Sequence, residues 1–286
     1  MFDRIAVVGG GTMGAGIAEV AARTGAQVQV YELAPESASA CQQRITASLE
    51  RAARKGKLAP EEAEAAQARL TYTTELTDLR DAQLVIEAIV EDEQAKTEVF
   101  AKLDATITSD EAIFASNTSS IPIMKLAMAT SRRDRVVGLH FFNPVPVLNL
   151  IEVVPSLLTS EDTVQQVTEF AETSLGKHVI RSQDRAGFIV NALLIPYILS
   201  AIRMLESGFA TAQDIDTGMV QGAAHPMGPL ALADLIGLDT TQAVALSLYE
   251  EFKEPLFAPP PLLARMVDAG LLGRKSGRGF LRYDNL

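Results

Sequence analysis

The sequence contains a single cysteine, Cys41, so no disulfide bond can form within one chain. Disulfide bonds persist in oxidising compartments, and a cysteine-poor sequence is typical of a reducing compartment. The N-terminal residues MFDRIAVVGG run directly into a strand-like apolar segment. They show neither the pattern of a signal peptide nor that of a transit peptide, so we expect a cytoplasmic protein.

The sequence also lacks an excess of positive charge and a long, uninterrupted apolar run. Its 25 Lys and Arg residues stand against 36 Asp and Glu residues, which gives a net charge of −11 at pH 7. Nucleic-acid binding requires cations that neutralise phosphates, so we expect no nucleic-acid partner. The most apolar stretch, FIVNALLIPYILSAI, is interrupted by Asn191 and Pro196. We therefore expect a buried helix there and no membrane span.

The clearest motif lies in the first 31 residues. RIAVVG and AQVQVYE are typical of short buried strands, and the segment between them has helical spacing of small and apolar residues. The turn after the first strand contains Gly9, Gly11 and Gly14 in the spacing G-x-G-x-x-G. These glycines permit a tight turn, the approach of a pyrophosphate and close packing of the helix. The helix N-terminus supplies amide donors for phosphates, so residues 9–14, including Thr12 and Met13, are predicted to contact a dinucleotide.

The acidic residue Glu32 identifies the preferred dinucleotide. It closes the second strand, 18 residues after Gly14, where a carboxylate can accept hydrogen bonds from ribose hydroxyls. The same carboxylate would repel a 2′-phosphate, so the sequence favours NAD over NADP. The alternative is an ordinary glycine turn in an α/β fold, which does not explain the acid at this position.

Strands alternate with helices through most of the chain, which predicts a doubly wound sheet followed by a second domain. Residues 84–91, 112–120 and 135–142 are predicted strands, and LNLIEVV is the next one. After Asp184 the pattern becomes helical throughout. We therefore predict a Rossmann-type NAD-binding domain at 1–184 and an all-helical domain at 185–286, whose apolar helices favour self-association as a homodimer or higher oligomer.

A buried acid and an upstream histidine indicate a catalytic pair. Glu152 lies in the apolar run LNLIEVV, where a carboxylate requires a partner. Pro144 and Pro146 break the chain between His140 and this run, so a reversal can bring Glu152 beside His140. The carboxylate would fix one imidazole nitrogen and leave the other to act as a base. A structural histidine and a Glu paired with an Arg are the alternatives; the strand-end position in a dinucleotide fold favours catalysis.

Several longer motifs identify a family that these residues resemble. The chain resembles the L-3-hydroxyacyl-CoA dehydrogenases over essentially its whole length, and its length fits the stand-alone bacterial form. The resemblance implies NAD-dependent interconversion of a short-chain L-3-hydroxyacyl-CoA, such as 3-hydroxybutyryl-CoA, and the 3-oxoacyl-CoA, with an acyl-CoA as partner and no metal. The motifs that carry it are ASNTSS, HFFNPV, IEVV, GFIVN and HPMGP.

The resemblance also implies residue roles. His140 is the implied general base, Glu152 its orienting partner, and Ser119 and Asn191 the contacts to the substrate. Ser48 and Lys55 match contacts to CoA, which makes the basic segment Arg44–Lys57 a candidate CoA phosphate site, although its charge alone equally fits a solvated helix face. Further implied contacts to the cofactor are Glu91, Lys96, Asn143 and Lys275.

Alternatives remain for both the residues and the activity. Ser119 could cap a helix that starts near Ile121, Asn191 could bond locally, and Glu91 with Lys96 could be an ordinary surface pair. His178 and His225 are expected to be structural. Relatives of the family oxidise sugar acids without CoA, and others serve as lens proteins without turnover. The basic segment argues against the first, and the full set of catalytic residues argues against the second.

Overall fold

A computed structural model describes residues 2–283. The chain divides into two compact units, and the boundary lies between Asp184 and Arg185. Each unit has its own hydrophobic core. They are described separately below.

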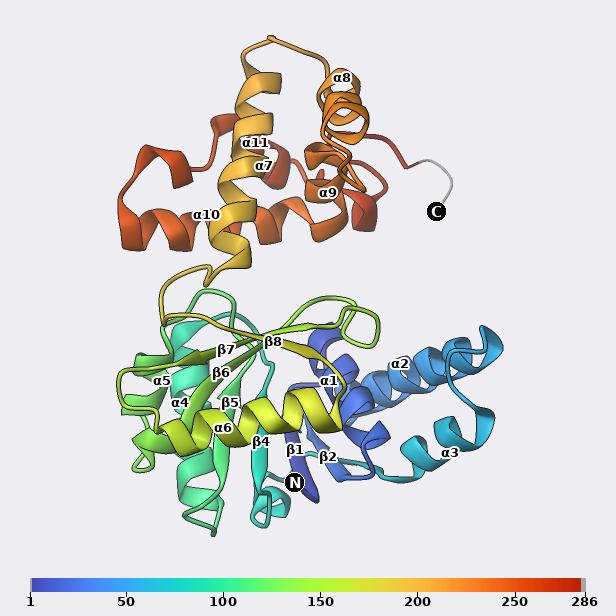
Figure 1. The fold of residues 1–286 in the computed structure, drawn as a ribbon, viewed down its shortest axis with the longest axis vertical. Coiled ribbons are helices and arrows are strands. Elements are labelled where there is room, and N and C mark those ends of the chain that lie inside the picture. Colours follow the sequence, from blue (N-terminus) through green and yellow to red (C-terminus); the bar gives the residue numbers. More distant parts are fainter. Residues whose placement is uncertain (1, 284–286) are drawn as a thin grey trace. The chain divides into compact units, whose positions relative to one another are not determined.

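The first unit is built on one eight-stranded sheet with the order β3-β2-β1-β4-β5-β6-β7-β8 (Figure 1). Every neighbouring pair is parallel except β6 and β7, which are antiparallel. The strands are β1 (Arg4–Val8), β2 (Gln27–Tyr31), β3 (Leu70–Thr73), β4 (Leu84–Glu87), β5 (Ile113–Ser116), β6 (Val136–Phe141), β7 (Leu150–Pro155) and β8 (His178–Arg181).

This strand order confirms the predicted doubly wound fold. The chain passes from β1 outward to β2 and β3, and then returns to place β4 on the other side of β1. Such a reversal creates a crevice at the carboxyl ends of the strands, where ligands of open α/β sheets bind. Ligand-binding residues are therefore expected to follow β1, β4, β5 and β6.

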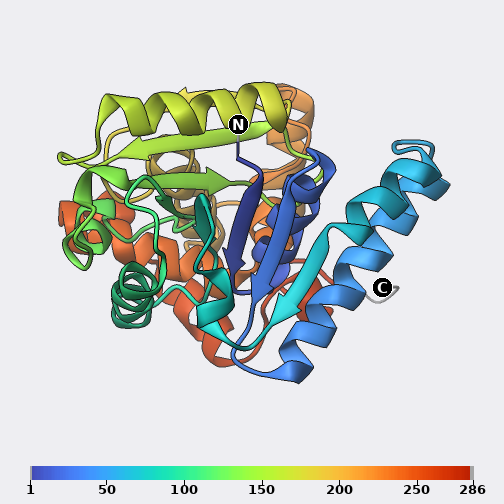
Figure 2. The same cartoon turned by 90° about the horizontal axis from the view of Figure 1, so that it is seen from below.

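Helices cover both faces of the sheet, so the strands are buried on both sides. Ile5 and Val7 of β1 join the core that includes α1 and α2, whereas Ala6 and Val8 are buried on the opposite face. The helices α2 and α3 lie side by side and extend away from β3 at the edge of the sheet (Figures 1 and 2). The helices of this unit are α1 (Thr12–Arg23), α2 (Pro35–Arg54), α3 (Pro60–Ala68), α4 (Glu93–Thr106), α5 (Ile123–Met128) and α6 (Glu161–Glu169).

Two predicted strands are shorter than expected. The predicted strand 112–120 forms only over Ile113–Ser116. The apolar run 84–91 forms a strand only as far as Glu87. Ala88 and Ile89 instead pack against Gly9 of the glycine turn, and Val90 is exposed. The apolar residues beyond Glu87 therefore serve packing against a neighbouring loop, and Glu87 becomes the last residue of β4.

The second unit is helical, as predicted. Its core contains Ile198, Leu199, Leu230 and Leu248. The first helix was expected from Arg185 but begins at Val190. The helices are α7 (Val190–Glu206), α8 (Ala212–Thr217), α9 (Pro229–Ile236), α10 (Leu238–Phe252) and α11 (Pro261–Asp268).

The late start of α7 has a backbone cause. Gly187 and Phe188 have φ values of +75° and +48°, which are incompatible with a right-handed helix. Across residues 2–283, no single helix has both the length and the apolar character to span a membrane. The helices α9 and α10 reach that length and apolar character only when taken together, across a bend of 98°.

Candidate active site

The glycine turn between β1 and α1 has the geometry that a dinucleotide requires. Gly9 has φ +93°, a conformation that favours glycine. A Cβ at Gly14 would collide with the carbonyl oxygen of Gly9, so the helix can pack this closely only with glycine there. A Cβ at Gly11 would meet open space among the described residues. Gly11 is also the N-cap residue of α1, so the helix N-terminus opens where a phosphate could approach.

Two side chains hold the main chain of this turn. The amide of Gly10 donates a hydrogen bond to Glu32 Oε1 at 2.6 Å, which fixes the carboxylate at the end of β2. Arg44 Nη1, from α2, donates to the carbonyl oxygen of Gly10 at 2.8 Å. The turn is therefore held on both sides, and Glu32 lies where the motif predicts an acceptor for ribose hydroxyls. These residues fit a bound dinucleotide.

A cavity of about 140 Å³ brings together residues that were predicted for two different ligands. Thr12 and Asn143, predicted cofactor contacts, line it together with Ser48, a predicted CoA contact. Lys55 is exposed at the end of α2, and Met13 is partly buried against the core. The first unit thus gathers Thr12, Ser48 and Asn143 around one space.

The predicted pair at β6 and β7 is present as a buried hydrogen bond. The two strands are antiparallel, and His140 lies directly opposite Glu152 in their register. His140 Nδ1 and Glu152 Oε2 are 2.7 Å apart, and the two side chains are 7% and 0% exposed. A cross-strand pair of this kind has little freedom to move. The geometry therefore fixes one nitrogen of the imidazole at the carboxyl end of β6.

The loop after β5 lies beside this strand end. Asn117 Oδ1 accepts a hydrogen bond from the amide of Phe141 at 2.9 Å, which links the loop to the residue after His140. Asn117 was not predicted, although it belongs to the motif ASNTSS. Ser119 follows two residues later and is half-buried. Asn117 thus ties the segment that carries Ser119 to the strand that carries His140.

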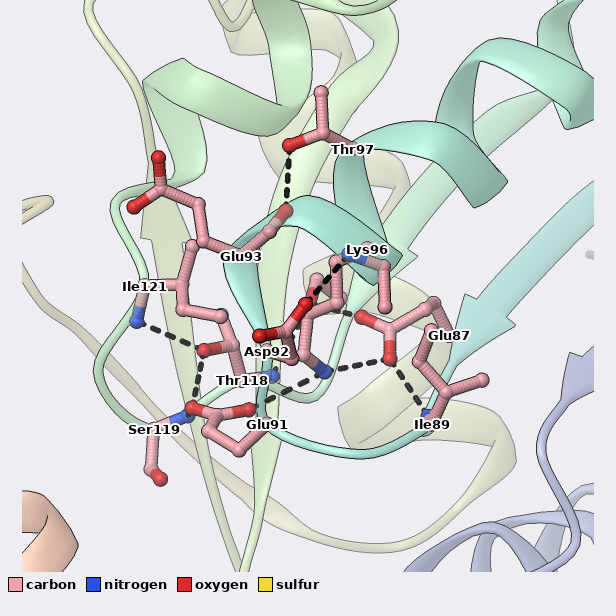
Figure 3. A network of polar contacts seen from close by, with 12 residues as sticks. Glu87, Ile89, Glu91, Asp92, Glu93, Lys96, Thr97, Thr118, Ser119 and Ile121 are labelled. Atoms are coloured by element: carbon pink, nitrogen blue, oxygen red, sulfur yellow. Dashed lines mark hydrogen bonds and ion pairs between the residues drawn. The ribbon is translucent and has the colours of Figure 1, made fainter.

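A buried ionic network lies at the end of β4 (Figure 3). Lys96 Nζ is 2.6 Å from Glu87 Oε1 and 3.2 Å from Glu91 Oε2. Lys96 is 1% exposed and Glu87 is 0% exposed, so this is not an ordinary surface pair. Glu87 was missed by the sequence analysis. The signal was available, because Glu87 is an acid within an apolar run, just as Glu152 is.

The basic segment Arg44–Lys57 is only partly available for a phosphate. Arg44 donates to the carbonyl oxygen of Gly10, and Arg54 lies 3.6 Å from Glu50 on the same helix. Arg51, Lys55 and Lys57 are exposed. The segment therefore combines a cation that supports the glycine turn with cations that face solvent.

Two predicted site residues belong to the second unit. Asn191 lies in the first turn of α7 and is half-buried. Lys275 Nζ donates to Asp239 Oδ2 at 2.6 Å. His225 Nδ1 is 3.0 Å from the hydroxyl of Tyr197, and His178 is exposed at the start of β8 in the first unit. The structural roles expected for these two histidines stay predictions.

The glycine turn, Glu32 and the buried His140–Glu152 pair, set at the carboxyl edge of a doubly wound sheet, define a nicotinamide-dependent oxidoreductase. Residues 4–185 match the model of the NAD-binding domain of 3-hydroxyacyl-CoA dehydrogenase, and residues 187–283 match the model of its C-terminal domain. The chain therefore belongs to the 3-hydroxyacyl-CoA dehydrogenase family. The predicted family and the predicted cofactor, NAD, are confirmed.

Several named relatives are similar over most of their length. The chain is 59% identical to the 3-hydroxybutyryl-CoA dehydrogenase of Mycobacterium tuberculosis over 281 residues, which cover 98% of each chain. It is 42% identical to the mitochondrial hydroxyacyl-coenzyme A dehydrogenase of Sus scrofa, covering 99% of this chain and 92% of that one. The crystal structure of (S)-3-hydroxybutyryl-CoA dehydrogenase PaaH1 from Ralstonia eutropha superposes with a TM-score of 0.94 at 42% identity, with complete coverage of both chains.

Proposed function

We propose that this protein interconverts L-3-hydroxybutyryl-CoA and acetoacetyl-CoA with NAD as the hydride acceptor. Two of the relatives described above carry the name 3-hydroxybutyryl-CoA dehydrogenase. The single observation that carries the chemistry is the 2.7 Å contact between His140 Nδ1 and Glu152 Oε2 at the carboxyl edge of the sheet. A histidine held in this way suits proton exchange with a hydroxyl group.

The proposed reaction separates a proton from a hydride. NAD, when bound, accepts the hydride from C3 of the substrate. His140 Nε2 takes the proton from the C3 hydroxyl as the C–O double bond forms. Glu152 holds the ring through Nδ1 and stabilises the imidazolium that results. Because oxidation releases a proton, high pH favours oxidation and low pH favours reduction.

Further contacts are proposed from the family motifs that these residues match in the sequence. Ser119 and Asn191 hold the oxygen atoms of the substrate. Glu32 binds the ribose hydroxyls, as the equivalent acid does in other folds with this motif. The remaining proposed contacts to the cofactor are Glu91, Lys96, Asn143 and Lys275.

Binding of CoA is assigned to Ser48 and Lys55. Lys55 is exposed, so its attraction to a phosphate is screened by solvent and worth about 1 kcal/mol. Lys55→Met should raise the KM for acetoacetyl-CoA roughly 3- to 10-fold and leave the KM for NADH unchanged. Lys102→Met, which removes an exposed lysine from α4, is the matched control. Equal effects of the two variants on KM would contradict the assignment.

The role of the second unit is also a proposal. We assign it to closure over the substrate and to formation of a homodimer in the cytoplasm. Exposed apolar side chains on and near its helices support self-association, among them Leu193 at 72% and Phe209 at 79% exposure. Analytical ultracentrifugation at micromolar concentration tests this, and a clean monomer would contradict it.

The decisive experiment follows NADH oxidation by absorbance with acetoacetyl-CoA and, in parallel, with free acetoacetate. Rapid turnover of the CoA ester alone supports the proposed substrate. Equal turnover of both compounds would indicate a dehydrogenase for non-CoA acids. Bound NADH with turnover of neither would overturn the proposed substrate and favour a sugar-acid substrate or a non-enzymatic role.

A further inference from the structure

Glu87 is a buried charged residue that the proposed mechanism does not use. It ends β4 and is 0% exposed. Its Oε2 accepts a hydrogen bond from Ser116 Oγ at 2.6 Å, and its Oε1 accepts one from the amide of Ile89 at 2.7 Å. Oε1 also lies 2.6 Å from Lys96 Nζ. A carboxylate buried at this depth requires such partners, and these attach it to three different segments.

Lys96 carries the connection onward from Glu87 to Glu91. Its ammonium lies 2.6 Å from Glu87 and 3.2 Å from Glu91, and the residue is 1% exposed. Lys96 is therefore held between two carboxylates. Removing the charge of Glu87 would leave the ammonium with one carboxylate partner and would alter the force that orients Glu91.

Glu91 in turn holds the segment that contains Ser119. Its Oε1 accepts hydrogen bonds from Thr118 Oγ1 at 2.6 Å, from the amide of Ser119 at 3.0 Å and from Ser120 Oγ at 2.9 Å. Oε2 faces Lys96. Figure 3 shows the side chain of Ser119 pointing away from this carboxylate. The network thus grips the main chain at Ser119 and leaves its hydroxyl to point elsewhere.

We propose that Glu87 is a positioning residue, which sets the orientation of Ser119 through Lys96 and Glu91. The inference deepens the proposed function, because it takes Ser119 as the contact to the substrate oxygen. A hydroxyl that contacts a reacting group must be placed to within a fraction of an ångström, and such placement is set by surrounding groups. The ionic contacts from Glu87 through Lys96 to Glu91 supply this placement, starting from β4, the strand beside β5.

The test compares Glu87→Gln in two backgrounds. The substitution keeps the shape and removes the charge. It should lower kcat for acetoacetyl-CoA reduction roughly 10- to 100-fold. In a Ser119→Ala background the same substitution should lower kcat less than about 3-fold, because the Ser119 hydroxyl that Glu87 positions is already absent. NADH affinity, measured by fluorescence, should also fall, because Lys96 and Glu91 are proposed cofactor contacts, and this fall should be the same with and without Ser119.

Hydrogen exchange provides a readout that does not depend on activity. In the enzyme without ligands, Glu87→Gln should speed amide exchange in residues 117–121, because Glu91 then holds the Ser119 amide less firmly. Asp104→Asn is the matched control. Asp104 lies about 12 Å beyond Lys96 along α4. It pairs with Arg132 at 2.7 Å and also accepts a hydrogen bond from the amide of Ser131. This control should speed exchange near Ser131 and leave the Ser119 segment and kcat unchanged.

The outcomes separate the two proposals. If Glu87→Gln costs the same factor with and without Ser119, or if Asp104→Asn lowers kcat equally, Glu87 is structural and the inference is wrong. If Glu87→Gln does not fold, Glu91→Gln weakens the same connection at its far end and should give a loss in kcat with the same dependence on Ser119. An unmodified enzyme that binds NADH without reducing acetoacetyl-CoA would overturn the proposed function as well.

Discussion

Two strands of the same sheet each carry a buried carboxylate beside a basic side chain, and we propose different roles for the two pairs. Glu152 in β7 and Glu87 in β4 are both 0% exposed, and each lies beside a basic side chain. The contact distances are 2.7 Å to His140 and 2.6 Å to Lys96. The partners differ in chemistry, since imidazole is the side chain generally used for proton exchange in catalysis, whereas an ammonium group acts mainly as a cation and hydrogen-bond donor.

The difference shows how to assign a role to a buried carboxylate. Burial and a short contact are common to both pairs and decide nothing between them. Because its partner can exchange a proton, we propose that Glu152 takes part in the reaction. Because three donors of residues 118–120 lie at the far end of the other network, we propose that Glu87 orients the Ser119 segment. The following variants break one pair while leaving the other intact.

His140→Gln should have the largest effect. It removes the proposed base from the first pair and leaves the network around Lys96 untouched. The expected loss in kcat is roughly 10²- to 10⁴-fold, the usual scale for a general base. NADH binding by fluorescence titration and the midpoint of thermal unfolding should stay close to those of the unmodified enzyme. A loss of cofactor affinity or of folding would mean that His140 is a structural residue.

Glu152→Gln should have a smaller effect through the same histidine. Glutamine keeps the shape of the side chain but removes the charge that stabilises the imidazolium, so kcat should fall roughly 10- to 10²-fold. The loss should persist in a Ser119→Ala background and shrink below about 3-fold in a His140→Gln background. The Glu87 variant should show the reverse dependence. If Glu152→Gln and Glu87→Gln lowered kcat by the same factor in every background, the two pairs would not have separate roles.

Lowering the pH should reduce the contribution of Glu91, in the network around Lys96, to the free energy of unfolding. Burial acts to raise the pKa of the Glu91 carboxyl, but the charge of Lys96 and three hydrogen bonds outweigh it and hold that pKa below its ordinary value. A lowered pKa in the folded state contributes stability above the ordinary glutamate pKa of about 4.3, and this stability is lost as the pH falls through the folded value.

The corresponding measurement is thermal unfolding of Glu91→Gln between pH 7 and pH 3.5. The variant should unfold at a lower temperature than the unmodified protein at pH 7, and the gap should narrow below about pH 4.3. Glu64→Gln, on the exposed side of α3, is the control and should show no gap at pH 7. A gap of constant size over the whole range would mean that the charge of Glu91 does not contribute.

The sequence predicted the fold and the first pair because both depend on local patterns. The G-x-G-x-x-G turn lies between a strand and a helix, and strands alternate with helices after it, so the fold could be predicted from these patterns together. Glu152 stands out in an apolar run, and the prolines after His140 indicate a chain reversal that returns it to the same strand end. A short reversal places His140 and Glu152 opposite each other, and this proximity requires no knowledge of distant contacts.

The second pair could not be predicted as readily, because its effect passes through contacts between segments distant in sequence. Glu87 reaches Ser116, 29 residues away, and Glu91 reaches the amide of Ser119, 28 residues away. The apolar residues after Glu87 extended the predicted strand to Glu91 and hid the true strand end. Lys96 was attributed to cofactor binding by resemblance alone, and that pattern gives no sign that its ammonium lies between two carboxylates.

The helix α2 contributes to both of the proposed ligand sites of the first unit. Arg44 bonds to the carbonyl oxygen of Gly10 in the glycine turn, and one turn later Ser48 lines the cavity shared with Thr12 and Asn143. A shift of this one rigid helix would change the binding of NAD and of the CoA ester together. By thermodynamic linkage, each ligand must then alter the affinity for the other by the same factor. We therefore expect NAD and the CoA ester each to change the affinity for the other, with α2 transmitting the effect.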